Sequence, residues 1–198
     1  SVIGAVVASA TLKLDRAVVV LPVGVAVGFL MIGLNFLTTW AAWRADPRQP
    51  TLLHFVSLEA WPVSAADLLR AAQRHPELLP LAQELHAQYW GLLPGVHRLW
   101  FDGGRVLLTL CIGDAQALLR QQHWEVDSVY LDGFSPQANP DIWSPHTLKA
   151  VARCCHPGTR LASWTVAGSV REALAARLRS WHAIRMVRPC SRTSLRSN

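Results

Sequence analysis

Residues 126–143 read VDSVYLDGFSPQANPDIW, and this stretch decides the fold class. Its first residues form an apolar run that is typical of a buried strand. Asp132 and Gly133 end the run, and Pro136 and Pro140 prevent the chain from resuming either helix or strand. In open α/β sheets ligands bind at the carboxyl ends of the strands, so in a fold of that class a strand ending at Asp132 predicts a site at this loop.

The loop after Asp132 carries Phe134, Asn139 and Trp143. A carboxylate, an amide and two aromatic rings on a loop stiffened by Pro136 suit a planar, polar substrate such as a nucleobase. The other interpretation is a strand-to-helix turn in which Asp132 only caps backbone amides. The spacing of these residues leaves both interpretations open.

Composition limits the class of protein. The 198 residues suffice for a sizeable core, and we predict one domain over residues 1–198 with a core of about 17–180. Hydrophobic residues make up 51% of the chain and charged residues 16%, which excludes a disordered chain. The formal net charge of +6 favours an anionic partner, with nucleic acid as the first candidate.

The cysteine and histidine spacings predict no metal site. Cys154 and Cys155 are adjacent, and the sequence contains neither a C-x-x-C nor an H-x-x-x-H pattern. The mixed apolar contexts of the four cysteines are typical of reduced, partly buried thiols in a cytoplasmic protein.

Residues 17–37, AVVVLPVGVAVGFLMIGLNFL, are almost wholly apolar. A run of about twenty such residues is long enough for a membrane-spanning helix, which would make the chain a membrane-anchored protein without enzymatic activity. Valine-rich runs that end in glycines are equally typical of a buried parallel strand entering a Rossmann-type turn. Because the rest of the chain is typical of a soluble enzyme, we favour the strand and turn.

The remaining elements follow from periodicity and from helix start and stop signals. A helix over 35–44 is expected to place Trp40 and Trp43 in the core and to end at Asp46. A second strand leads into Glu59, and Ser64 begins a capping box. The other predictions are helices over 77–90, 116–122, 145–154 and 168–178, a hairpin with strands 96–101 and 105–110, a turn at 156–159 and a strand over 160–165.

Several separate motifs occur in a fixed order. LDGFSPQANPDIW begins at Leu131, and the others are GLNFL (33–37), LHFVSLEAWP (53–62), LLPGVHRLWFDGGRVLLTL (92–110), GDA (113–115) and WTVAGSVR (164–171). Together they resemble the methyltransferase domain of the MnmC family over about residues 33–175. The resemblance implies a Rossmann-like class I S-adenosylmethionine-dependent methyltransferase fold with a helical and hairpin insert.

The resemblance also implies a reaction and its partners. Members of the MnmC family methylate the 5-aminomethyl group of a wobble (2-thio)uridine in tRNA, in the cytoplasm. Many of them continue into a flavin-dependent oxidoreductase domain that this sequence lacks. We therefore expect S-adenosylmethionine as the cofactor, no flavin, and a separate oxidoreductase as a possible partner.

The family's functional residues map onto this chain through the same motifs. The resemblance implies that Glu59 accepts hydrogen bonds from the cofactor ribose and that Asp114 accepts one from adenine while capping a helix. Asp132 is the candidate catalytic base and amine-orienting group. The remaining candidates are Gly28, Gly33 and Asn35 for the cofactor, and Phe134, Pro136, Asn139, Trp143 and Arg171 for the uridine and the RNA.

The cofactor turn departs from the family pattern G-E-x-GFGTGLNF. Without gaps, Phe29 and Met31 occupy glycine positions and Val27 replaces the acid. With two single-residue insertions, Gly24 and Gly28 match glycines instead, but the acid is still missing. Small residues matter there because the backbone must approach the cofactor closely. The departure supports a second interpretation, a catalytically degenerate homologue with impaired cofactor binding.

Overall fold

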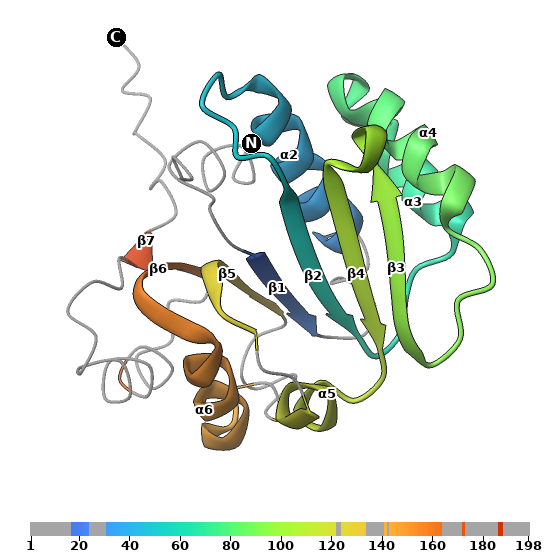
Figure 1. Ribbon diagram of the computed structural model, residues 1–198. Helices are drawn as coiled ribbons and strands as arrows, with labels where there is room; N and C mark the ends of the chain where they lie inside the picture. The colour runs from blue at the N-terminus through green and yellow to red at the C-terminus, as the bar shows by residue number, and fades with distance from the viewer. Residues whose placement is uncertain are drawn as a thin grey trace, which may run out of the picture.

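A seven-stranded sheet forms the centre of the molecule (Figure 1). A computed structural model describes residues 17–23, 31–121, 124–133, 141, 143–163, 172 and 186–187. The strand order is β3-β4-β2-β1-β5-β6-β7. The strands are β1 (Ala17–Val23), β2 (Leu53–Glu59), β3 (Gly95–Phe101), β4 (Val106–Ile112), β5 (Val126–Gly133), β6 (Cys155–Ser163) and β7 (Met186–Val187).

All pairings in the sheet are parallel except that of β3 with β4. β2 and β4 lie on one side of β1, whereas β5 and β6 lie on the other. This reversal of direction at β1 is the doubly wound arrangement, so the predicted Rossmann-like fold class is confirmed.

Helices cover both faces of the sheet (Figure 1). α2 (Met31–Ala45), α3 (Ala65–Ala72), the 3₁₀ turn η2 (Pro76–Leu78) and α4 (Leu79–Gln88) pack on one face, and α5 (Ala115–Gln121) and α6 (Pro145–Cys154) pack on the other. Side chains alternate along each strand, so Phe55 of β2 joins the first apolar cluster and Val56 joins the second. A strand with both faces covered is buried throughout, as is every residue of β4.

The apolar run at 17–37 divides into a strand and the start of a helix. The favoured strand is confirmed as β1, and no helix among the described residues is long and apolar enough to cross a membrane. α2 begins at Met31 and not at Asn35, so the predicted helix start was wrong by four residues. The first turn of α2 carries no acidic residue, and its apolar side chains give no sequence signal of a helix start. Trp40 and Trp43 are buried as predicted.

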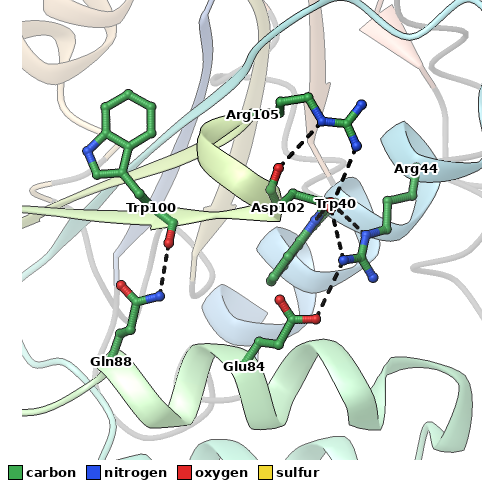
Figure 2. Close-up of polar contacts among 7 residues, drawn as sticks. All are labelled: Trp40, Arg44, Glu84, Gln88, Trp100, Asp102 and Arg105. Atoms are coloured by element: carbon green, nitrogen blue, oxygen red, sulfur yellow. Dashed lines mark hydrogen bonds and ion pairs between the residues drawn. The ribbon is translucent and has the colours of Figure 1, made fainter.

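The predicted hairpin is β3, the turn η3 (Asp102–Gly104) and β4. It is no appendage of the sheet, because β4 pairs in parallel with β2 over its whole length. Asp102 adopts a left-handed conformation, with φ of 55°. Its carboxylate accepts hydrogen bonds from Arg44 Nε at 2.6 Å, Arg44 Nη2 at 3.0 Å and Trp40 Nε1 at 2.8 Å (Figure 2). These bonds join the hairpin turn to the last turns of α2.

Residues 156–159 belong to β6, so the prediction of a turn separate from the following strand was wrong. Cys155 pairs with Val126 and Arg160 pairs with Ser128, so the residues between them bulge out of the ladder. Thr159 stabilises the bulge, because its hydroxyl donates to the Val126 carbonyl at 2.6 Å and accepts from the His156 amide at 2.9 Å.

Two other helix starts follow the sequence signals. The Ser64 hydroxyl accepts from the Asp67 amide at 3.2 Å, which confirms the capping box at α3. α6 spans the predicted residues, and Ser144 caps it through the Thr147 amide at 3.2 Å. The helix predicted over 168–178 lies largely outside the described residues.

Candidate active site

The predicted acidic residues lie at neighbouring strand ends. Glu59 ends β2 and stands opposite Ile112, the last residue of β4. The Gly113 amide donates to the Glu59 carbonyl at 2.7 Å, which brings Asp114 next to the end of β2. On the other side of β1, Asp132 pairs with Pro22, one residue before β1 ends. All three acids therefore lie along the carboxyl edge of the sheet, where ligands of such folds bind.

Glu59 is a buried carboxyl group at the end of β2. It is 4% exposed, and its Oε1 accepts a hydrogen bond from the buried Ser57 hydroxyl at 3.0 Å. Ser57 and Glu59 are two residues apart in β2 and so point to the same face. The bond from Ser57 therefore engages Oε1. Burial raises the pKa of Glu59 well above its usual range, and the Ser57 hydrogen bond opposes this rise.

Tyr89 is a neighbour of this carboxyl that sequence analysis missed. It caps the carboxyl end of α4 and is 7% exposed. Burial, followed by the negative charge of Glu59, raises the pKa of the Tyr89 hydroxyl. Tyr89 follows Leu81 and Leu85 at four-residue spacing, a signal that could have placed it on the buried face of α4.

Asp114 has the predicted capping role. Its Oδ1 accepts a hydrogen bond from the Ala117 amide at 2.8 Å, and its carbonyl accepts from the Leu118 amide at 3.0 Å. The residue is exposed, so its second carboxylate oxygen faces solvent or a ligand. Gly113, with φ of 147°, provides the backbone conformation that directs Asp114 onto α5. The hydrogen bond to adenine stays a prediction.

Gly33 and Asn35 lie in the first turns of α2. A Cβ at Gly33 would lie 3.3 Å from Leu68 Cγ, so this glycine allows α2 to approach α3 closely. Asn35 is 7% exposed, and its carbonyl accepts from the Thr39 hydroxyl at 2.7 Å. Gly33 thus has a packing role that the sequence did not indicate, and the cofactor contacts of both residues stay predictions.

Trp143 is part of the core and is only 7% exposed. It belongs to the apolar cluster between the sheet and α6, with Leu148 and Val151 among its members. The ring is therefore engaged in packing, and little of it remains to contact a substrate. Gly28, Phe134, Pro136, Asn139, Arg171 and the side chain of Asp132 lie outside the described residues.

The cysteines in the described part of the chain are buried free thiols: Cys111, Cys154 and Cys155. Burial raises the pKa of Cys111 to about 11 and that of Cys155 to about 12. Such thiols stay protonated and unreactive at neutral pH. The described side chains also contain no group of three or more histidine, cysteine, aspartate or glutamate residues that could hold a metal ion.

The residues at this edge fit the adenosine part of S-adenosylmethionine. A buried acid at the end of the second parallel strand is placed for a ribose diol, and the bond from Ser57 engages Oε1 of Glu59 rather than Oε2. Asp114, at the end of the next strand, presents a carboxylate oxygen beyond the one that caps α5. The backbone hydrogen bond from Gly113 to Glu59 keeps the Glu59 and Asp114 carboxyl groups at adjoining strand ends.

Curated relatives match most of this chain at high identity. The protein named tRNA 5-methylaminomethyl-2-thiouridine biosynthesis bifunctional protein MnmC from Paracidovorax citrulli is 76% identical over 143 residues, which cover 72% of this chain and 22% of that protein. The protein of the same name from Polaromonas naphthalenivorans is 70% identical over 144 residues, covering 73% and 23%. The chain thus spans less than a quarter of the length of these relatives.

A solved structure shares the fold. The crystal structure of MNMC2 from Aquifex aeolicus matches with a TM-score of 0.58 at 20% identity, over 88% of this chain and 51% of that one. The family model described as S-adenosyl-L-methionine-dependent methyltransferase matches residues 76–178, more than half of the chain. With its doubly wound sheet and the acids along its carboxyl edge, this chain belongs to the family of S-adenosyl-L-methionine-dependent methyltransferases.

Proposed function

We propose that this chain methylates the amine of a 5-aminomethyl (2-thio)uridine at the wobble position of tRNA. The observation that carries the proposal is the 76% identity, over 143 residues, to a protein whose name states its part in making tRNA 5-methylaminomethyl-2-thiouridine. Buried Glu59 and capping Asp114, at adjoining strand ends, support a cofactor site within the aligned fold.

The cofactor supplies a methyl group on a positively charged sulfur, and the reaction is an in-line displacement by the amine nitrogen. Positioning and a free nitrogen lone pair are its main requirements. Glu59 would accept hydrogen bonds from the two ribose hydroxyls of the cofactor, and Asp114 would accept one from the exocyclic amine of adenine. The family resemblance assigns Gly28, Gly33 and Asn35 to the turn that would approach the cofactor. These contacts hold the adenosine part at the edge of β2 and β4.

Asp132 orients the amine and accepts its proton. An aliphatic amine is mostly protonated at neutral pH, so an acceptor close to the nitrogen is needed before it can attack. The pairing of Asp132 with Pro22 sets its backbone at the end of β1, next to the cofactor side of the sheet. Because carboxylates are ordinarily weak bases, we expect Asp132 to act more through orientation than through basicity.

The loop after Asp132 receives the uridine. Phe134 provides an aromatic face for the base, Asn139 a hydrogen-bonding amide and Pro136 stiffness. Trp143, buried between the sheet and α6, anchors the far end of the loop. Arg171 contacts the RNA backbone. We place the reaction in the cytoplasm, with a separate flavin-dependent oxidoreductase as a possible supplier of the aminomethyl substrate and with no metal.

The test separates cofactor binding from methyl transfer. Calorimetry of S-adenosylmethionine with the pure chain is expected to show saturable, micromolar binding. Incubation with tRNA that carries 5-aminomethyl-2-thiouridine should then convert this nucleoside to its methylamino form, detected by mass spectrometry of the digested tRNA. Asp132→Asn should bind the cofactor normally and lose methyl transfer.

Two results would contradict the proposal in different ways. A folded sample that does not bind the cofactor would identify a degenerate homologue. Cofactor binding without methylation of this tRNA would identify another substrate.

A further inference from the structure

Ser57 is a polar residue in a part of β2 that is otherwise apolar. Its side chain lies on the same face of the strand as Leu53 and Phe55, which belong to the apolar cluster between the sheet and α2, α3 and α4. Ser57 is 0% exposed, and it pairs with Val20 of β1 on one side and with Leu110 of β4 on the other. A hydroxyl buried in this way costs free energy unless it makes a hydrogen bond, so this serine needs a partner.

The partner of the Ser57 hydroxyl is the carboxyl group of Glu59. The hydroxyl donates to Glu59 Oε1 at 3.0 Å, and both side chains are buried. Residues two apart in a strand share one face at a spacing that the backbone fixes. The bond therefore connects the last side chain of β2, at the carboxyl edge of the sheet, to a side chain held between two neighbouring strands.

A hydroxyl in this place has two effects on the carboxyl group. It favours the ionised form, because the hydrogen bond from Ser57 opposes the rise in the pKa of Glu59 that burial causes. It also restricts the rotation of the carboxylate by holding Oε1. A carboxylate has about four lone-pair sites, so one bond from Ser57 leaves acceptor capacity for ligand hydroxyls.

We propose that Ser57 is a positioning residue of the cofactor site, whose hydroxyl holds the Glu59 carboxylate in the orientation that accepts the ribose hydroxyls of S-adenosylmethionine. The inference rests on the proposed function, because it takes Glu59 as the ribose acceptor. Ser57 acts through Glu59 and need not touch the cofactor. An acceptor that is oriented before the ligand arrives loses less conformational entropy on binding.

The neighbouring elements carry other titratable side chains. They include Asp67 in α3, Tyr89 at the end of α4, His97 in β3 and Asp114 after β4. The shift in the pKa of Glu59 has burial and the Ser57 bond as its causes. The Glu59→Gln variant keeps all the neighbouring groups, so a pH dependence that this variant loses belongs to Glu59.

The experiment is calorimetry of S-adenosylmethionine with the full chain. Ser57→Ala should bind the cofactor about three- to tenfold more weakly than the wild type, because the acceptor has lost the bond that orients it. In a Glu59→Ala background the same substitution should change the affinity by less than about twofold, since Ser57 then has no carboxylate to hold. The double-mutant cycle isolates the coupling between the two side chains.

The pH profile separates positioning from a general effect on packing. The affinity of the wild type should fall as the pH drops through the raised pKa of Glu59. Ser57→Ala should move this fall to higher pH, because the bond that favours the ionised form is gone. The weakening should therefore be larger on the acid side of the fall than on its alkaline side, whereas a loss of packing would be the same at every pH.

Ser57→Cys and Ser128→Ala are matched controls. Sulfur fills the place of the hydroxyl but donates only weakly, so Ser57→Cys should bind the cofactor nearly as weakly as Ser57→Ala. Ser128 of β5 is also a buried strand serine, but it pairs with Val18 near the start of β1, away from the carboxyl edge. Ser128→Ala removes the same atom and should leave the affinity and its pH profile unchanged.

The outcomes distinguish this inference from the proposed function. A folded wild type that does not bind S-adenosylmethionine overturns both. Cofactor binding without methylation of tRNA overturns the proposed function alone, because the measurements on Ser57 involve no RNA. The inference alone is overturned if Ser57→Ala binds the cofactor like the wild type, or if it weakens binding as much in the Glu59→Ala background. Wild-type affinity in Ser57→Cys would also overturn it, because volume and not the hydrogen bond would then be decisive.

Discussion

Glu59 is a carboxyl group that the fold keeps out of water at the end of β2. Because burial raises its pKa, the folded chain binds this proton more tightly than the unfolded chain does. Its contribution to stability is therefore complete below the unfolded pKa of about 4.3 and is lost as the pH rises through the folded pKa. The side chain thus lowers stability at neutral pH in the absence of a ligand.

We expect Glu59→Gln to raise the melting temperature of the cofactor-free chain at about pH 8, where wild-type Glu59 must be desolvated as an anion. Glutamine keeps an oxygen that accepts from Ser57 but carries no charge. Thermal unfolding of both proteins from about pH 4 to 8 measures the difference. The difference in melting temperature should become smaller toward about pH 4. A difference that does not change with pH would contradict a raised pKa of Glu59 as its cause.

Cofactor binding should depend on pH in the opposite sense. An ionised Glu59 accepts both ribose hydroxyl protons, whereas the protonated form offers one acceptor fewer, so affinity for S-adenosylmethionine should fall as the pH drops through the raised pKa. Calorimetry over the same pH range measures this. Glu59→Gln should bind at least about tenfold more weakly and lose the pH dependence.

Asp102 shows the reverse behaviour at the opposite edge of the sheet. Its hydrogen bonds to Arg44, together with that to Trp40, lower its pKa despite partial burial. Its contribution to stability is present above the unfolded pKa of about 3.9 and is lost as the pH falls through the lower folded value.

Asp102→Asn should lower the free energy of unfolding by about 1–2 kcal/mol at neutral pH, a modest value because Arg44 is 40% exposed. Asparagine tolerates the left-handed backbone, so the loss reports the charge. Denaturant titration measures it. Glu84→Gln, which removes a longer and more exposed contact to Arg44, should change stability by less than about 0.5 kcal/mol. Equal losses would show that Asp102 is no stronger a partner of Arg44 than Glu84 is.

At the scale of elements, α2 and α3 meet through Gly33. A Cβ at this position would lie 3.3 Å from Leu68 Cγ, tighter than an ordinary contact. Alanine would gain about 1 kcal/mol in helix propensity, and we expect the crowding of Leu68 to cancel this gain. Gly33→Ala should therefore be close to neutral in the wild type.

The same substitution should stabilise a Leu68→Ala background by about 1 kcal/mol, because the crowded side chain is gone. Leu68→Ala alone should cost about 2–5 kcal/mol. A double-mutant cycle of unfolding free energies isolates the coupling. Additive effects would show that the Leu68 side chain does not crowd an alanine at position 33.

The elements that the sequence predicted correctly have local signals. Ser144 and Pro145 mark the start of α6 through a cap and a fixed φ, and the Ser64 cap marks α3 in the same way. The start of α2 was missed because the residues around Met31 are apolar on every side. The bulge of β6 was missed because it depends on the hydrogen bond from Thr159 to Val126, a contact between distant parts of the chain.

The candidate site was predictable to the extent that it follows strand ends. Glu59 and Asp114 could be located because each ends or follows an apolar run. The burial of Trp143 and the approach of Tyr89 to Glu59 could not, because both arise from packing between elements. The packing of Gly33 against Leu68 is hidden for the same reason.

At the scale of the whole molecule, a net charge of +6 should make RNA binding sensitive to salt. Each phosphate contact releases condensed counterions, so the logarithm of affinity should fall linearly with the logarithm of salt concentration between about 50 and 200 mM. Arg98→Ala should reduce the slope by about one unit if Arg98 contacts a phosphate. An affinity insensitive to salt would contradict this view.

The hydrogen bonds from Arg44 and Trp40 to the Asp102 carboxylate have a consequence for how the chain folds. The β3–β4 hairpin joins residues close in sequence, such as Leu99 and Leu108, whereas the β1–β5 pairing must bring Val20 to Tyr130. Closing the longer loop costs more entropy, so we expect the hairpin and α2 to assemble first, around the Asp102 carboxylate. Asp102→Asn should then slow refolding in stopped-flow experiments and leave the unfolding rate almost unchanged. A turn at the edge of the sheet opposite Glu59 would thus set how quickly a newly made chain becomes an enzyme.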